Sequence, residues 1–252
     1  MDQSNNRIIF EGMTSVSALI NAARAGNSKR IINAVYFDKS KTGKERRRLS
    51  FIKAASAELG FEIRLIESDE IDILATGNTH GGVLADVSEA VYPVFAPENI
   101  NNEGFVAVID GVEDPYSLGY SLRALYACGC DAVLLPRHLP NAADSVLCKA
   151  SAGATELLKI FVGDICEMVT QYKKKGYRVA CAAIPDSQVC YESDLSRPLV
   201  LIIGGEKRGI SSRLMALSDL NVRIPYGREF MGSLSTASAV SVLAYEVLRQ
   251  NP

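Results

Sequence analysis

The sequence has few of the residues from which metal sites and disulfide frameworks are built. Its 252 residues include only two histidines, His80 and His138, so no histidine-rich metal site is expected and no metal is predicted. The six cysteines form no CxxC pair and mostly lie in apolar stretches. We therefore predict that they are reduced core residues of a cytoplasmic protein rather than disulfide or zinc ligands.

Long apolar runs and an excess of charge are also missing. No run of about 18 apolar residues is present to span a membrane. The polar and acidic start, MDQSNNRIIFEG, differs from an export signal, which is basic and then apolar. We expect a cytoplasmic protein with no membrane partner. The formal net charge of −2 disfavours a uniformly basic nucleic-acid-binding protein but allows a local basic patch.

Alternating helix and strand patterns predict an α/β protein of two domains. Residues 1–95 have the pattern of a small α/β domain, with a helix over 14–25 and strands over 31–37, 61–66 and 83–87. The polar residues 96–103 have no periodicity and are the predicted linker. Residues 104–252 are the second α/β domain, with strands over 105–109, 131–135, 178–183, 199–203 and 221–224 and helices over 118–128, 164–175 and 236–249.

A basic segment over residues 39–48 interrupts the first domain. Six of its ten residues are cationic, and the segment opens a predicted helix. RNA binding depends heavily on phosphate contacts, so Lys44, Arg46, Arg47 and Arg48 are candidate RNA-binding residues. A solvated helix face has the same composition, and the two interpretations are about equally favoured.

Two glycine-bearing loops follow strands in the last third of the chain. The apolar strand 199–203 leads into Gly204-Gly-Glu-Lys-Arg-Gly209, and the strand 221–224 leads through Gly227 and Gly232 to a serine-capped helix. Glycine allows a ligand to approach the backbone closely, so a cofactor cradle is plausible. An ordinary α/β crossover has the same pattern, and these residues alone favour it slightly.

Four stretches resemble, in order and spacing, the motifs of the SpoU/TrmH branch of the SPOUT RNA 2′-O-methyltransferases. Residues 114–119, DPYSLG, with Arg123 are similar to D-P-x-N-x-G-x-x-x-R, and residues 151–154 to S-A-G-A. Residues 201–209, LIIGGEKRG, resemble L-x-x-G-N-E-G-x-G. Residues 224–227, IPYG, continue to SLSTASA at 233–239 and resemble I-P-M-x-G and S-L-N-V-S-V-A. More weakly, residues 79–83 resemble the family's L30e-like module.

The resemblance implies a fold, a cofactor and partners. The expected fold is a small L30e-like RNA-binding α/β domain followed by a SPOUT α/β domain with a C-terminal trefoil knot, an exception to unknotted topology. S-adenosylmethionine is expected in the knot, held by Gly204, Gly209, Ile224, Ser233 and Leu234. The implied partners are rRNA or tRNA and a second copy of the chain, with sites near the subunit interface. We expect this homodimer to use the small-residue face of helix 236–249 together with the helix over 118–128, in which Leu122 and Leu125 are predicted to point inward.

The resemblance also places candidate catalytic residues. Arg123 corresponds to the family's catalytic arginine. A guanidinium group stays protonated at neutral pH, so it is a poor general base. We expect it to clamp a phosphate and stabilise the developing alkoxide; the alternative is a structural ion pair with Asp114 or Glu206. Glu206 is expected to orient Arg123 or a substrate group. Ser117 and Ser235 stand where the family has asparagines, and they can hydrogen-bond through water.

These replacements keep several functions open. Ser117, Gly205 and Ser235 occupy asparagine positions of the family pattern, and each change removes amide donors. The leading hypothesis is an S-adenosylmethionine-dependent methyltransferase of a ribose 2′-hydroxyl in rRNA or tRNA. The alternatives are a catalytically degenerate SPOUT protein that serves as an RNA-binding or assembly factor, and a SPOUT enzyme with another nucleophile. An oxidoreductase is disfavoured because no GxGxxG follows an early strand.

Overall fold

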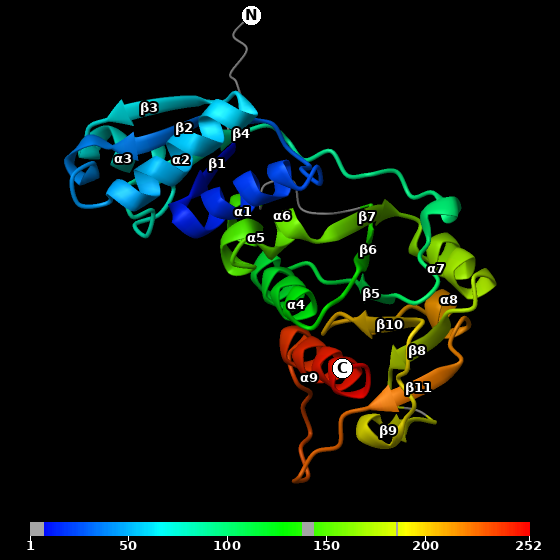
Figure 1. The fold of residues 1–252 in the computed structure, drawn as a ribbon. Coiled ribbons are helices and arrows are strands. Elements are labelled where there is room, and N and C mark those ends of the chain that lie inside the picture. The colour runs from blue at the N-terminus through cyan, green and yellow to red at the C-terminus, as the bar shows by residue number, and fades with distance from the viewer. Residues whose placement is uncertain (1–7, 138–143, 185) are drawn as a thin grey trace, which may run out of the picture. The chain divides into compact units, whose positions relative to one another are not determined.

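The computed structural model of the chain describes residues 8–137, 144–184 and 186–252 (Figure 1). Residues 1–7, on which the export prediction partly rests, and His138 lie outside the described residues. The described chain forms two compact units. The N-terminal unit comprises residues 8–91 and 144–157, and the C-terminal unit comprises residues 92–137 and the described residues from 158 to 252.

The N-terminal unit is built on a four-stranded mixed sheet of order β1-β4-β2-β3. Strand β4 runs antiparallel to β1 and β2, whereas β3 runs parallel to β2. The strands are β1 (Ile8–Glu11), β2 (Ile32–Asp38), β3 (Glu62–Ile66) and β4 (Val83–Val87). The helices are α1 (Gly12–Arg24), the 3-10 turn η1 (Lys39–Lys41), α2 (Arg46–Leu59), α3 (Ser68–Leu74), α5 (Asp144–Ala150) and α6 (Ala154–Leu157).

Both faces of this sheet are covered, which explains why β2 and β4 are apolar along most of their length. On one face Phe37 packs with Ile20 of α1 and Ile52 of α2, and all three side chains are fully buried. On the other face Tyr36 and Leu84 pack with Ile71 of α3. Burying a large apolar side chain stabilises a fold by about 1.5–3 kcal/mol, so these contacts hold the unit together.

The hairpin of α5 and α6 belongs to the N-terminal unit although it lies far along the sequence. Cys148 of α5 is fully buried in the core with Phe10 and Val16. The turn between the helices carries the S-A-G-A stretch, and a Cβ on Gly153 would lie 2.3 Å from the Cβ of Ala18 in α1. Lys29 donates hydrogen bonds to the carbonyl groups of Thr155 and Glu156, at 2.7 and 3.2 Å. In this structure the S-A-G-A stretch is therefore a packing turn.

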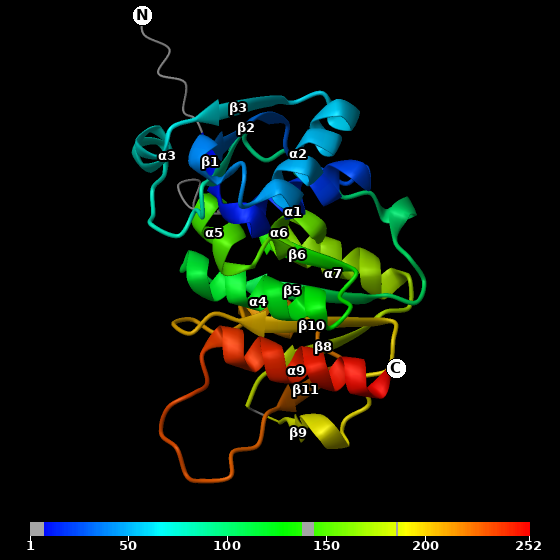
Figure 2. The ribbon, with the colours of Figure 1, turned by 60° about the vertical axis from the view of Figure 1, so that its left-hand side comes forward.

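The C-terminal unit is built on a parallel seven-stranded sheet of order β7-β6-β5-β10-β8-β11-β9 (Figure 2). Its strands are β5 (Phe105–Asp110), β6 (Ala132–Pro136), β7 (Lys159–Gly163), β8 (Arg178–Ala182), β9 (Gln188–Val189), β10 (Leu199–Gly204) and β11 (Leu220–Arg223). Its helices are η2 (Pro97–Asn99), α4 (Pro115–Ala127), α7 (Ile165–Lys174), η4 (Cys190–Glu192), α8 (Ser212–Met215) and α9 (Thr236–Gln250).

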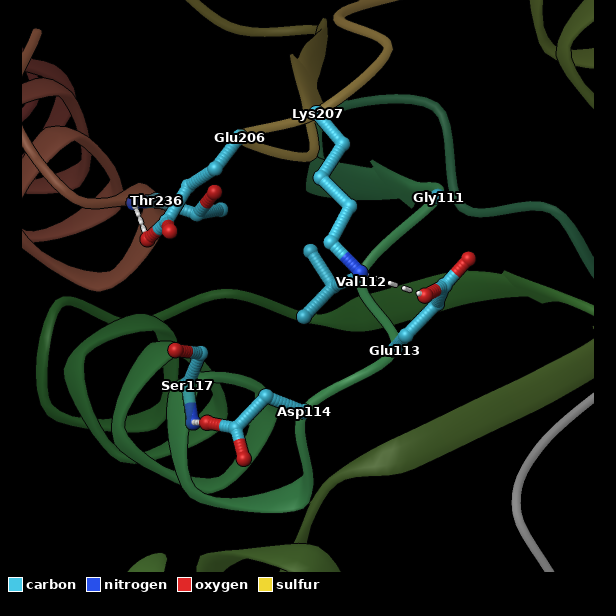
Figure 3. A pocket seen from close by; sticks show the side chains of 8 residues that line it. All are labelled: Gly111, Val112, Glu113, Asp114, Ser117, Glu206, Lys207 and Thr236. Carbon is cyan, nitrogen blue, oxygen red and sulfur yellow. Dashed lines mark hydrogen bonds and ion pairs between the residues drawn. The ribbon is translucent and has the colours of Figure 1, made fainter.

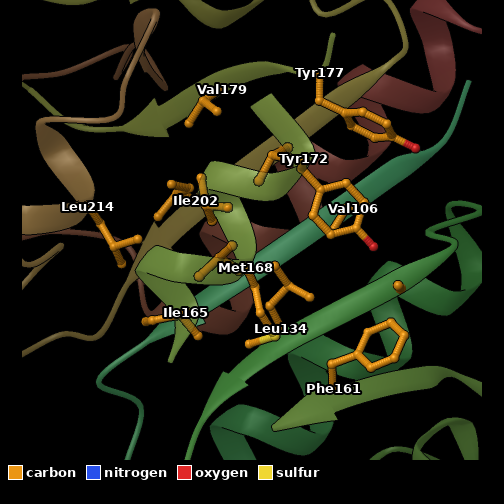
Figure 4. Packing of buried hydrophobic residues seen from close by; sticks show 14 of the residues in the cluster. Val106, Leu134, Phe161, Ile165, Met168, Tyr172, Tyr177, Val179, Ile202 and Leu214 are labelled. Carbon is orange, nitrogen blue, oxygen red and sulfur yellow. The ribbon is translucent and has the colours of Figure 1, made fainter. Parts of the chain in front are cut away.

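Helices cover both faces of the parallel sheet, so its central strands are buried and apolar throughout. Figure 4 shows one face, where Met168 and Tyr172 of α7 and Leu214 of α8 pack on Val106 and Ile202. Helices α4 and α9 pack against each other on the opposite face. Their buried side chains include Leu118, Leu122, Leu125, Val240, Leu243 and Val247.

The α/β class, with a small mixed-sheet unit and a parallel-sheet unit, and the main helices and strands predicted from the sequence are confirmed, with ends that differ by at most three residues. The trefoil knot stays a prediction. Leu122 and Leu125 of α4 are fully buried within the chain, in agreement with the prediction that they point inward. All six cysteines are free and five are buried, as predicted. Burial raises the pKa of the Cys130 and Cys148 thiols to about 12, so both stay protonated. None of the helices in the described ranges is long and apolar enough to cross a bilayer.

Candidate functional site

The strand order of the parallel sheet defines where a ligand site can form. Strand β10 lies between β5 and β8, so the carboxyl ends of these strands and of β11 meet at one edge of the sheet. The loops that leave this edge are residues 111–114, 183–184, 205–211 and 224–235. Ligands of open α/β sheets bind at such an edge, where the direction of strand order changes.

A pocket of about 750 Å³ lies at this edge. The five residues predicted to hold a cofactor all line it: Gly204, Gly209, Ile224, Ser233 and Leu234. They come from two loops about 20 residues apart in sequence, so the structure brings both glycine-bearing loops to one pocket. The binding of a cofactor by these residues stays a prediction.

The backbone packing around the first loop requires glycine at positions 204 and 205. A Cβ on Gly204 would lie 2.3 Å from the carbonyl carbon of Gly209, and a Cβ on Gly205 would lie 2.3 Å from the carbonyl oxygen of Gly111. Gly205 also donates a hydrogen bond of 2.6 Å to the Asp110 carbonyl group. The close approach at Gly204 is therefore between two backbone segments, whereas the sequence suggested an approach between backbone and ligand.

An aromatic wall of the pocket is absent from the sequence-based prediction. The rings of Tyr226 and Phe230 meet edge to face, with their centroids 5.9 Å apart, and both line the pocket. The Leu234 amide donates a hydrogen bond of 3.1 Å to the Tyr226 hydroxyl, which joins the two ends of the loop. The signal in the sequence was the presence of two aromatic residues in the glycine-bearing loop that follows β11.

A second, smaller pocket of about 90 Å³ adjoins the ends of β5 and β10 (Figure 3). It is lined by Gly111, Val112, Glu113, Asp114, Ser117, Glu206, Lys207 and Thr236. The fold thus brings the candidate catalytic residues Ser117 and Glu206 to one pocket. Lys207 and Glu113 form an ion pair of 3.3 Å at its mouth, and both side chains are exposed, so the pair contributes little to stability.

Glu206 lines both pockets and stabilises the start of α9. Its carboxylate accepts a hydrogen bond of 3.1 Å from the Thr236 amide, and the Thr236 hydroxyl donates to the Gly204 carbonyl group at 3.3 Å. A carboxylate at a helix N-terminus is favoured by the helix dipole. Glu206 therefore joins the two pocket loops, whereas the sequence suggested contact with Arg123 or a substrate group.

Ser235 lies outside both pockets. It is the N-cap of α9, and its hydroxyl accepts a hydrogen bond of 3.2 Å from the Ser238 amide. The Ser235 side chain is exposed. In this structure the residue at the family's asparagine position stabilises the helix.

Arg123 also lines neither pocket. Its side chain is exposed on α4, one turn from Tyr120, and Tyr116 lies a further turn toward the start of the helix. Arg123 makes no hydrogen bond or ion pair with any residue in the described parts of the chain. The alternative prediction of an ion pair with Asp114 or Glu206 is therefore wrong for a single chain.

The predicted RNA-binding residues lie at the start of α2 in the N-terminal unit. Lys44, Arg46 and Arg47 are exposed and have no ion-pair partner in the described structure. Arg48 is also exposed and pairs with Glu45 at 3.2 Å. The first turn of α2 contains three arginines and no acidic residue.

The chain is similar in sequence and in fold to RNA methyltransferases of several bacteria. Residues 104–245 match the SpoU rRNA Methylase family. The chain is 29% identical over 214 residues to the 23S rRNA (guanosine-2'-O-)-methyltransferase RlmB of Pseudomonas putida, covering 82% of this chain and 86% of that protein. It is 28% identical over 234 residues to RlmB of Ralstonia nicotianae, covering 90% and 92%. An AdoMet-bound rRNA methyltransferase from Sinorhizobium meliloti has a similar fold, with a TM-score of 0.79 at 19% identity, covering 98% of this chain and 88% of that chain.

Proposed function

The chain belongs to the SpoU rRNA methylase family, and from this premise we propose that it is an S-adenosylmethionine-dependent methyltransferase of a ribose 2′-hydroxyl in rRNA or tRNA. The observation that carries the proposal is the pocket at the ends of β10 and β11, which all five predicted cofactor residues line. Its volume of about 750 Å³ lies within the usual range for small-molecule sites.

The residues of this pocket fit S-adenosylmethionine. Backbone groups of the two loops can bind its polar edges, and the Tyr226–Phe230 wall can pack against a planar base or a sulfonium cation. When bound, this cofactor supplies an electrophilic methyl group. Glu206 connects the two loops through Thr236 and Gly204, so it acts as a positioning residue for the pocket.

Arg123 is the proposed catalytic residue. Its guanidinium would hold a phosphate beside the target ribose and stabilise the alkoxide that develops as the 2′-hydroxyl loses its proton. The guanidinium is exposed and has no ion-pair partner within residues 8–137, 144–184 and 186–252, so it is available for this contact. Ser117, which lines the smaller pocket, is the proposed second polar contact to the RNA.

We also propose a homodimer, formed by the outer faces of α4 and α9. Large exposed side chains gather there: Tyr116, Tyr120, Val242 and Tyr245 are 53%, 51%, 41% and 61% exposed. Arg123 lies on the same face of α4 and lines neither pocket of its own chain, which supports a site completed by a second copy. Helices α4 and α9 are the two helices that the sequence prediction assigns to the dimer surface.

The proposed RNA-binding and catalytic roles follow the two units of the fold. The sequence predicts an L30e-like RNA-binding domain at residues 1–95, a linker at 96–103 and a SPOUT domain with a trefoil knot at 104–252. In the structure the α5–α6 hairpin belongs to the N-terminal unit, and residues 96–103 belong to the C-terminal unit. The start of α2 supports RNA binding by the N-terminal unit. Cations in the first turn of a helix are disfavoured by its dipole, so Arg46 and Arg47 have a structural cost, and neither has an ion-pair partner among the residues whose structure is described. The buried free cysteines support a cytoplasmic location.

Calorimetry with S-adenosylmethionine tests the cofactor site. Ala239 of α9 lines the large pocket, so Ala239→Phe should fill it and weaken binding by at least about tenfold, or 1.4 kcal/mol. Ala57→Phe makes the same change at an exposed position of α2 and should leave the affinity unchanged. Wild-type protein that binds no cofactor at millimolar concentration would refute the proposal.

Mass spectrometry of RNA from a strain that lacks the protein tests the reaction. Loss of one ribose methylation is the expected result. Cofactor binding without any change in RNA methylation would favour the second function, an RNA-binding or assembly factor. One observation favours that alternative: the Gly111 backbone occupies the space that a side chain at position 205 would need.

A further inference from the structure

A buried carboxylate lies at the base of the basic segment in the N-terminal unit. Asp38 ends β2 and is only 3% exposed. It accepts hydrogen bonds from the Ser40 amide at 2.8 Å, the Ser40 hydroxyl at 2.6 Å and the Ser68 hydroxyl at 2.9 Å. Burial opposes ionisation of this carboxyl group, but the hydrogen bonds from Ser40 and Ser68 outweigh burial and hold its pKa below the usual value. Asp38 is therefore an anion at neutral pH.

Asp38 connects three segments that are distant in sequence. Its side chain caps the turn η1 and reaches Ser68 at the start of α3. Its amide donates a hydrogen bond of 2.9 Å to the Gly82 carbonyl group, at the end of the turn 78–82. A buried carboxylate with several donors is costly to remove, because its partners are left unsatisfied.

The same contacts determine where the first cations of the segment lie. Lys41 packs on Gly82, since a Cβ on Gly82 would be 2.8 Å from the Lys41 Cδ atom and 3.1 Å from its Nζ atom. Gly82 has a φ of +84°, which glycine adopts without strain. Lys39 forms an ion pair of 2.7 Å with Glu67, next to Ser68. The chain that leads to Lys44 and Arg46 is therefore held at its start by Asp38 and the turn 78–82.

We propose that residues 39–48 and the turn 78–82 form one preorganised surface for RNA phosphates, with Asp38 as its positioning residue. This inference rests on the proposed RNA-binding function and deepens it. The partner follows from charge complementarity, because the exposed cations of the segment outnumber its single acid, the half-buried Glu45. A fixed surface binds phosphates without first ordering a flexible loop, which would cost affinity.

An electrostatic effect of Asp38 and a positioning role of Asp38 predict opposite changes in the RNA affinity of the Asp38→Ala variant, so this variant tests the proposal. Asp38→Ala removes a negative charge from a basic surface, so electrostatics alone would strengthen RNA binding. If Asp38 positions the surface, the variant binds RNA several-fold more weakly, and the slope of log affinity against log salt concentration falls by about one. The probe is a labelled RNA stem-loop, because phosphate contacts carry no sequence information.

Glu45→Ala is the matched control. It removes the same charge from the same segment, but the Glu45 side chain makes no capping hydrogen bond. Its affinity for the stem-loop should rise or stay unchanged. Ser40→Ala combined with Ser68→Ala removes the donors to Asp38 without changing the charge, and it should also weaken binding. This double variant keeps the test valid if Asp38→Ala unfolds, which thermal melting will show.

The possible outcomes distinguish a failure of this inference from a failure of the proposed RNA-binding function. Wild-type protein that does not bind the stem-loop refutes the RNA-binding proposal and the inference with it. Wild-type binding that weakens on loss of Arg46, Arg47 and Arg48, but is unchanged or stronger in Asp38→Ala, refutes the positioning role alone. Cofactor affinity should be unchanged in every variant.

Discussion

At the scale of single residues, the most informative feature is the exposed side chain of Arg123. Its guanidinium is exposed on α4 and has no ion-pair partner among the residues that the structure describes. A structural arginine would be neutralised by a nearby carboxylate, but Asp114 accepts a hydrogen bond from the Ser117 amide and Glu206 caps α9. The charge of Arg123 is therefore available to an RNA phosphate.

Substitution of Arg123 tests its proposed role. Arg123→Ala should lower the methylation rate by roughly 100-fold or more, the effect of losing one preorganised donor to a developing oxyanion. Arg123→Lys keeps the charge but loses the planar fork, so it should retain a measurable fraction of the rate. Single-turnover kinetics measure both rates, and cofactor affinity should survive each change.

The pH dependence of the Arg123→Lys variant distinguishes a phosphate-clamping role of this residue from a general-base role. A clamping lysine works while protonated, so activity of Arg123→Lys should not require alkaline pH. A lysine acting as base would work only at raised pH, where the ammonium loses its proton. Wild-type rates in Arg123→Ala would remove this residue from the mechanism.

At the scale of elements, the α5–α6 hairpin completes the N-terminal unit. Gly153→Ala should destabilise the protein by about 2–4 kcal/mol, because its Cβ would overlap Ala18 and its φ of +86° is unfavourable for alanine. Gly176→Ala is the control, with a φ of +87° and open space around the Cβ position. The Gly176→Ala variant should lose only about 1–2 kcal/mol of unfolding free energy. If urea unfolding shows equal losses of unfolding free energy in the two variants, the contact with Ala18 is unimportant.

The first turn of α2 should show a trade-off between stability and binding. Replacing Arg46 and Arg47 by Glu should stabilise the helix by about 0.3–1 kcal/mol each, because anions are favoured at a helix N-terminus. RNA affinity should fall at the same time. Lys53→Glu reverses a charge at an exposed position further along α2, so it should give no such stabilisation. Unchanged RNA affinity in the Arg46 and Arg47 variants would identify the segment as a solvated surface.

At the scale of the whole molecule, the outer faces of α4 and α9 are the proposed dimer surface. Tyr120→Glu combined with Tyr245→Glu should shift the protein from a dimer to a monomer of 27.2 kDa in sedimentation velocity. Burying two carboxylates in an apolar interface is costly. Tyr191→Glu changes a side chain of η4 that is 57% exposed, and it should leave the dimer intact. A wild-type monomer at micromolar concentration would contradict this arrangement.

Much of the candidate site could be predicted because its residues are close in sequence. Gly204 and Gly209 lie in one loop, and Ser233 and Leu234 lie just before the helix that Ser235 caps. Tyr226 and Phe230 were missed because a glycine-bearing loop has no periodicity, so the presence of two aromatic residues there does not show whether their side chains face a pocket. The loop contact between Gly205 and Gly111 was missed for another reason: it joins segments almost 100 residues apart.

The helices, the strands and the family of this protein could be predicted from the sequence, because apolar periodicity, caps and motif spacing are local properties that neighbouring residues set. The position of β10 between β5 and β8, the packing of the S-A-G-A turn on α1 and the exposure of Arg123 became visible only in the folded chain. These features depend on which distant surfaces pack together. That choice is made by the summed burial of many side chains and is not encoded in any single stretch.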